Sequence, residues 1–279
     1  MRRAILLALC VALAAAGDPP RRIVSLSPNV TEILYGIGAF AEVAGVTDYC
    51  TYPPGVAKLP SVGGWQNPDL EKLLALRPDL VVVDDAEAAL IQDKLRDLGF
   101  RLLVVPNRSI ADVYRTMRDL GRATGREAGA EKLIAATRES LARISRRTAA
   151  LPRLSVVLIV DRTPGTLREL YTATGGSYLA ELVEIAGGRI AVPAVPAGYG
   201  KLSKEDLLAL NPDVILDFIH GTDSRFARDA LAAWQEMPEL KAVRAHRVYG
   251  VNEDYVPHNS QRIVDTAALF ARLIHPEAK

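Results

Sequence analysis

The chain has 279 residues, with 34 lysines and arginines against 33 aspartates and glutamates. The resulting net charge of +1 argues against a protein that neutralises many phosphates, so we expect no nucleic-acid partner. Hydrophobic residues make up 49% and charged residues 24%, which excludes disorder, collagen or coiled coil as the main architecture.

The first sixteen residues have the composition of a secretion signal. Two arginines follow the initiating methionine, and residues 4–16 carry no charge. This apolar run is shorter than the roughly 20 residues that a membrane-spanning helix needs. It ends in three alanines, which suit a signal peptidase. We therefore expect residues 1–16 to be a signal peptide, cleaved near Ala16, and the mature protein to be periplasmic.

A lipid anchor would require Cys10. Leu9 precedes that cysteine, where a small residue is preferred, and the apolar run before it is short. We therefore expect that the protein is not a lipoprotein.

Residues 22–34 predict a short strand followed by a helix. Ser27, Pro28 and Asn29 open the helix, because proline is tolerated in a first turn. Asn29 and Glu32 have the spacing of a capping box. The glycines at positions 36 and 38 are interpreted as a helix C-cap, because a dinucleotide-binding motif would have to follow a strand.

A helix-and-strand pattern occurs twice, in residues 70–83 and 204–216. Each copy has an apolar helical spacing, then a Pro-Asp pair that stops the helix, then a buried strand. Glu71 of the first copy aligns with Glu205 of the second. The shared phrase indicates an internal duplication of an α/β unit.

Residues 126–150 predict a long helix between the two halves. The segment has no proline, no glycine after Gly129, and an apolar stripe. A helix of about 22 residues would be about 33 Å long, enough to bridge two lobes. We expect an N-terminal lobe over residues 21–125 and a C-terminal lobe over residues 151–279.

The fold class that follows is α/β, with two lobes joined by one long interdomain helix. Strands alternate with helices in each half, which predicts mainly parallel sheets. A cleft between two such lobes is a common ligand site.

Signatures of catalysis are missing from the sequence. No phosphate loop or Gly-x-Ser-x-Gly elbow occurs, and the four histidines show no paired metal-ligand spacing. Cys50 is interpreted as a partly buried small residue. We therefore assign no catalytic residue and no metal site, and we expect a protein that is not an enzyme.

Aromatic residues occur in turn-rich loops of both halves. Trp65 and Tyr199 are flanked by glycines, and each precedes one copy of the repeat. Residues 48–54 and 252–258 form two further loops with tyrosines. Two rings that face each other across a cleft suit a large flat or apolar ligand.

With these motifs, the mature chain resembles the periplasmic substrate-binding proteins of ABC importers for vitamin B12, haem and iron–siderophores. The segments that carry the resemblance are residues 22–34, Tyr52-Pro53-Pro54, residues 70–83, Gly187-Gly188 and the second copy of the repeat. Within this family it looks most like the vitamin B12-binding branch, through residues 48–54 and 62–66.

The resemblance implies a monomer that captures a cobalamin-like corrinoid between two lobes and holds no covalently bound cofactor. The loaded protein would dock on a permease dimer in the inner membrane, where Glu71 and Glu205 would meet arginines on the two subunits. The ligand-binding residues that it implies are Pro28, Tyr49, Trp65, Gln66, Tyr171, Tyr199, Asp254, Tyr255 and His258.

The sequence also departs from that branch, so two alternatives stay open. Tyr199 stands where the best-known members have tryptophan, and His258 where they have arginine. The first alternative is a binder of iron–siderophores, haem or another metal chelate, for which Arg162 and Arg168 are the candidate arginines. The second is a chelatase-like metal enzyme built on two α/β lobes.

Overall fold

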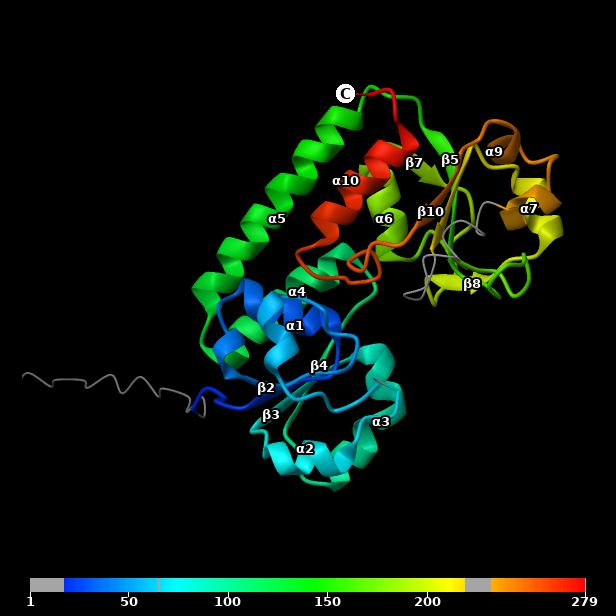
Figure 1. The fold of residues 1–279 in the computed structure, drawn as a ribbon. Helices are drawn as coiled ribbons and strands as arrows, with labels where there is room; N and C mark the ends of the chain where they lie inside the picture. Colours follow the sequence, from blue (N-terminus) through cyan, green and yellow to red (C-terminus); the bar gives the residue numbers. More distant parts are fainter. Residues whose placement is uncertain (1–17, 65, 219–231, 279) are drawn as a thin grey trace, which may run out of the picture.

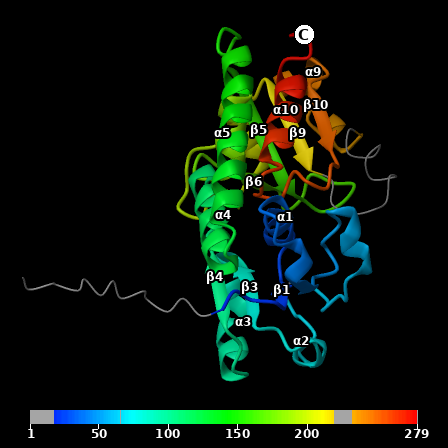
Figure 2. The same cartoon turned by 90° about the vertical axis from the view of Figure 1, so that its left-hand side faces the viewer.

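One long helix, α5 (Glu127–Thr148), connects two α/β lobes and runs along one side of the molecule (Figure 1). The structure, a computed structural model, describes residues 18–64, 66–218 and 232–278. Helix α5 confirms the predicted long helix. Helices α4 (Ile110–Thr124) and α10 (Ile263–Ile274) lie against it (Figure 2). None of the helices in these described ranges is long and apolar enough to cross a membrane.

The first lobe is built on a four-stranded parallel sheet. Its strands, in spatial order, are β2 (Val43–Gly45), β1 (Ile23–Ser25), β3 (Leu80–Asp84) and β4 (Leu102–Val105). The helices of this lobe, besides α4, are α1 (Pro28–Gly36), α2 (Leu70–Leu76) and α3 (Asp85–Asp97), with short 3₁₀ turns η1 (Phe40–Glu42) and η2 (Pro54–Lys58). Successive strand side chains point to opposite faces, so Val82 packs toward α1 and α4, whereas Val81 and Val83 pack toward α2 and α3.

The second lobe has a mixed sheet in the order β10-β9-β5-β6-β8, with β7 also paired to β5. Its centre is parallel, as predicted, but β6 and β8 are antiparallel to their neighbours. The strands are β5 (Leu154–Asp161), β6 (Tyr171–Ala173), β7 (Gly188–Ile190), β8 (Tyr199–Lys201), β9 (Val214–Phe218) and β10 (Val248–Val251). Its helices are α6 (Tyr178–Ile185), α7 (Lys204–Leu210), η3 (Trp234–Glu236), α9 (Lys241–Arg244) and α10.

The duplicated pattern forms the same local structure in both lobes. Helices α2 and α7 each end at a residue in the left-handed conformation, Arg77 with φ 46° and Asn211 with φ 39°. In each copy, the aspartate after the proline accepts a backbone hydrogen bond at the start of the strand that pairs with the strand of that copy. Asp79 accepts a hydrogen bond from the backbone N–H of Arg22, which precedes β1. Asp213 accepts from that of Ser155 in β5.

The predicted capping box at the start of α1 is wrong. Ser27 is the N-cap, and no side chain caps this helix. Because Pro28 occupies the first turn, Asn29 lies inside the helix, and both Asn29 and Glu32 are buried. The interpretation of the following glycines is confirmed, since Gly38 has a φ of 84° just beyond the end of α1.

Candidate functional site

A cleft of about 670 Å³ lies between the lobes, within the usual size range of small-molecule sites. It is placed at the carboxyl ends of strands from both sheets, where open α/β sheets usually bind ligands. The lining residues at these strand ends are Ser27, Asp84 and Asn107 in the first lobe, and Val160 and Phe218 in the second.

Four of the predicted ligand-binding residues line this cleft: Pro28, Tyr49, Tyr199 and His258. The Tyr171 ring stacks on Tyr199, with the ring centroids 6.5 Å apart and the planes 17° from parallel. These two tyrosines, from β6 and β8, form an aromatic wall on the second lobe. Burial raises the pKa of Tyr199, so its hydroxyl stays protonated at neutral pH.

The remaining predicted residues lie elsewhere or outside the described residues. Tyr171, Asp254 and Tyr255 are not part of the described lining, and Gln66 is exposed. Asp254 accepts a hydrogen bond from the Thr51 hydroxyl at 2.8 Å, which joins the two lobes beside the cleft. Trp65 falls outside the described residues. The two predicted docking glutamates, Glu71 and Glu205, are exposed in the first turns of α2 and α7.

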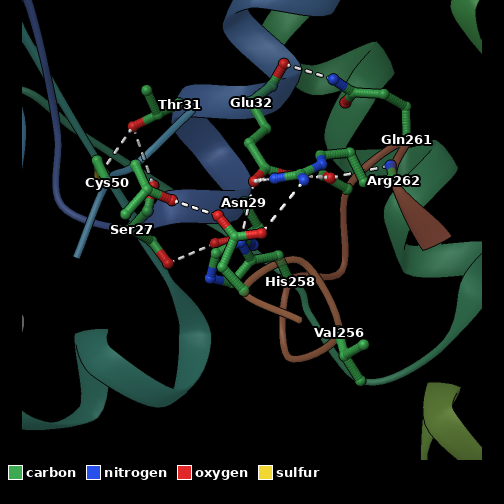
Figure 3. Close-up of polar contacts among 12 residues, drawn as sticks. Ser27, Asn29, Thr31, Glu32, Cys50, Val256, His258, Gln261 and Arg262 are labelled. Carbon is green, nitrogen blue, oxygen red and sulfur yellow. Dashed lines mark hydrogen bonds and ion pairs between the residues drawn. The ribbon is translucent and has the colours of Figure 1, made fainter. Parts of the chain in front are cut away.

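A buried ionic network joins the lobes next to the cleft (Figure 3). The Glu32 side chain, 1% exposed, accepts from His258 Nδ1 at 2.9 Å and from Arg262 Nη1 at 3.0 Å. The Ser260 hydroxyl also donates to this carboxylate, and Gln261 Nε2 donates to the Glu32 carbonyl at 2.8 Å. His258 thus contacts Glu32 of the other lobe and also lines the cleft.

Arg262 extends this network through aromatic contacts. Its guanidinium lies 4.8 Å from the ring centroids of both Tyr52 in the first lobe and Tyr255 in the second. Such cation–π contacts are strongest where water is excluded. Tyr255 therefore serves the lobe contact in this structure.

Two buried acids, Asp84 and Glu87, line the first-lobe side of the cleft. Asp84, at the end of β3, accepts from the backbone N–H of Glu87 at 3.0 Å, and its Oδ2 lies 3.2 Å from the Ser27 hydroxyl oxygen. Burial raises the pKa of Asp84. Burial, and secondly the charge of Asp84, raises the pKa of Glu87 to about 9. Sequence reasoning missed both acids, although the position of Asp84 at the carboxyl end of a buried strand was a signal for that residue.

This pKa predicts a pH dependence of stability that Glu87→Gln should remove. The folded protein holds a proton on Glu87 up to about pH 9, whereas the unfolded chain releases it near the ordinary glutamate pKa of 4.5. The protonation of Glu87 therefore stabilises the folded state most below pH 4.5, and this contribution to the free energy of unfolding is lost as the pH rises toward 9.

In urea denaturation at pH 5, 7 and 9, the unfolding free energy of Glu87→Gln should fall less with pH than that of the unmodified protein. Glu127→Gln, at an exposed position in the first turn of α5, is the control. Parallel pH curves for Glu87→Gln and the unmodified protein would contradict the assignment.

The polar and aromatic residues that line the cleft can bind an organic ligand through hydrogen bonds and ring contacts. Within the described residues, no group of His, Cys, Asp and Glu could hold a metal ion. Cys50 is buried, with its Sγ beside the Thr31 and Thr47 hydroxyls, and burial raises the pKa of its thiol. Such a thiol is a poor nucleophile.

Comparison with known proteins identifies relatives over nearly the whole chain. The family described as periplasmic binding protein matches residues 23–255. The ABC transporter substrate-binding lipoprotein YvrC of Bacillus subtilis is 31% identical over 265 residues, which cover 92% of this chain and 81% of YvrC.

Two solved structures are similar in fold. The periplasmic vitamin B12-binding protein BtuF of Vibrio cholerae is 25% identical and has a TM-score of 0.77, with 92% of this chain and 98% of BtuF covered. A periplasmic haem-binding protein of Pseudomonas aeruginosa has a TM-score of 0.80 at 24% identity, with 93% and 94% covered. The second likeness shows the fold alone. Because YvrC is a lipoprotein, the comparisons do not support the expectation that a lipid anchor is absent.

Proposed function

Because the chain belongs to the periplasmic binding protein family, we propose that it captures a cobalamin-like corrinoid and delivers it to an ABC permease. Proteins of this family are extracytoplasmic and bind small molecules for import. The main support for the proposal is the interlobe cleft, which is lined by Tyr199, whose ring also stacks on that of Tyr171. Aromatic faces suit the broad apolar surface of a corrin ring. The likeness to BtuF supports the choice of ligand.

Titration calorimetry against cobalamin, cobinamide, haem and a ferric siderophore tests the choice of ligand. We expect stoichiometric binding of the two corrinoids, and protein soaked in cobalamin should stay red after desalting. Tight binding of haem or the siderophore alone would favour the first alternative. Turnover of porphyrin and metal would favour the chelatase alternative.

The side chain of Arg162 argues against an anionic siderophore. Its guanidinium pairs with buried Asp217, with Nη2 2.8 Å from Oδ2. Trp234 Nε1 donates to the same carboxylate oxygen. Arg162 is therefore committed to the core of the second lobe, so it does not offer the cleft a free positive charge.

Removal of the second-lobe aromatic wall should weaken corrinoid binding. A buried aromatic anchor typically contributes about 2–4 kcal/mol, so Tyr199→Ala should raise the dissociation constant for cobalamin roughly thirty-fold or more. We expect Trp65→Ala to have a similar effect. Tyr199→Phe keeps the ring and is the matched control, with an expected change of less than about threefold. Unchanged affinity in Tyr199→Ala would reject this wall as part of the site.

Two further parts of the proposal concern export and docking. We propose that residues 1–16 direct export and that Glu71 and Glu205 contact the two permease subunits. Both glutamates are exposed at matching positions of a duplicated helix, which supports the second part.

A further inference from the structure

We propose that Asn29, Asp84 and Glu87 form a carboxamide-recognition wall in the cleft. This inference rests on the proposed corrinoid function, and it states which groups of the ligand the first lobe recognises. Corrinoids carry primary carboxamides around their ring, whereas haem and many siderophores carry carboxylates. The wall would therefore select the amide-bearing ligand.

Two buried polar atoms in this wall have no protein partner among the described residues. Asn29 is 3% exposed, and its Oδ1 accepts the Ser27 hydroxyl, which leaves Nδ2 without a partner (Figure 3). Glu87 is 6% exposed, and its Oε2 also has none. Both residues line the cleft. Buried polar groups are nearly always hydrogen-bonded in folded proteins, so these two atoms are available to bond polar groups of a ligand in the cleft.

The hydrogen-bonding chemistry of the wall fits a carboxamide. The raised pKa keeps Glu87 protonated at neutral pH, so it donates one hydrogen bond and can accept another. Asn29 Nδ2 donates only, and Asp84 accepts. A carboxamide accepts at its carbonyl oxygen and donates from its nitrogen, so it can satisfy both kinds of group. An ionised carboxylate can only accept.

The charge of the wall also disfavours a carboxylate. Asp84, Asp85 and Glu87 lie together on this side of the cleft. Among the described residues that line the first-lobe side, Arg108 is the one basic side chain; it is exposed and pairs with Asp85 at 3.7 Å. A ligand carboxylate here would meet Asp84 and would lose its hydration without a free cation to replace it. Such unfavourable contacts are a common source of specificity.

The test compares cobinamide with its monocarboxylate derivatives, in each of which one peripheral amide is hydrolysed. In calorimetry with the full protein, at least one derivative should bind roughly tenfold more weakly than cobinamide, which is the scale of one lost buried hydrogen bond. In the double variant Asp84→Asn with Glu87→Gln this discrimination should shrink to within about threefold. If all derivatives bind as tightly as cobinamide, or if the double variant discriminates as strongly as the unmodified protein, the proposed carboxamide recognition is wrong.

Single variants separate recognition from folding. Glu87→Gln keeps a donor and an acceptor, so cobinamide affinity should stay within about threefold, whereas Glu87→Ala should lose roughly tenfold. Circular dichroism and thermal unfolding establish that each variant is folded. If Glu87→Ala does not fold, the binding of the monocarboxylate derivatives to the unmodified protein and to the double variant still tests the carboxamide wall.

The two proposals fail in distinguishable ways. Tight cobinamide binding without discrimination against the carboxylates overturns the carboxamide wall and leaves the corrinoid function standing. A protein that binds no corrinoid at all overturns both.

Discussion

Replacement of both Glu71 and Glu205 by alanine should abolish ligand uptake and leave the affinity for the ligand unchanged. The two glutamates occupy the same position in the duplicated helices α2 and α7, and neither is among the residues that line the cleft. Each helix also exposes a leucine one turn later, Leu74 at 45% and Leu208 at 43%. Residues three apart lie on the same side of a helix, so each lobe presents an acid beside an apolar side chain.

The symmetry of this arrangement matches a permease made of two similar subunits. Two equivalent acids can each meet a positive charge on one subunit, and such pairs set the orientation and the rate of encounter. Raised salt should weaken complex formation of the unmodified protein more than that of the double variant, because salt screens exposed charges.

Helix chemistry offers a simpler account of the same glutamates. An acid in an exposed first turn stabilises its helix by about 0.3–1 kcal/mol through the macrodipole. Uptake of labelled cobalamin by cells that carry the permease distinguishes the two accounts. Glu127→Ala, which changes an exposed glutamate in the first turn of α5, is the matched control and should transport normally. If the double variant also transports normally, or if it loses its ligand, the docking assignment is wrong.

The elements that could be predicted from sequence are those whose signals are local. Helices α2 and α7 end where Pro78 and Pro212 follow a left-handed residue, and the buried strands follow at once. Helix α5 has an uninterrupted helical composition. Strands β6 and β8 could not be found in this way, because they are three residues long and are defined by pairing with each other. No periodicity is readable over so short a segment.

The residues that line the cleft could be predicted only in part, because Tyr178 and Phe218 also line it and no local pattern pointed to them. Tyr49 and Tyr199 could be picked out from their glycine-rich or turn-rich loops, and both line the cleft. Asp84 has a local role as the N-cap of α3, and that role gives no hint of the cleft. Glu32 suited a capping box by spacing, but its partners come from a loop more than 220 positions later in the chain. A contact of that kind is fixed by the packing of the lobes.

Glu32→Ala should destabilise the protein more than any other glutamate substitution that we propose. Its carboxylate accepts from His258, Ser260 and Arg262 in an environment that excludes water. Removal of one partner from a buried ionic contact leaves the other charge uncompensated, which costs about 3–5 kcal/mol. Urea denaturation at pH 7 should show this as a lower midpoint, and Glu32→Gln, which keeps an acceptor, should lose less.

The matched control is an exposed ion pair of the same kind. Arg118 Nε lies 2.7 Å from Glu131 Oε1, and the two side chains are 41% and 57% exposed. Exposed pairs contribute little to stability, so Glu131→Ala should leave the urea midpoint nearly unchanged. The further change Arg262→Ala should cost less in the Glu32→Ala background than in the unmodified protein, because the two residues are coupled. If Glu32→Ala and Glu131→Ala shift the midpoint equally, or if the costs of the Glu32 and Arg262 changes are additive, the buried network does not hold the lobes together.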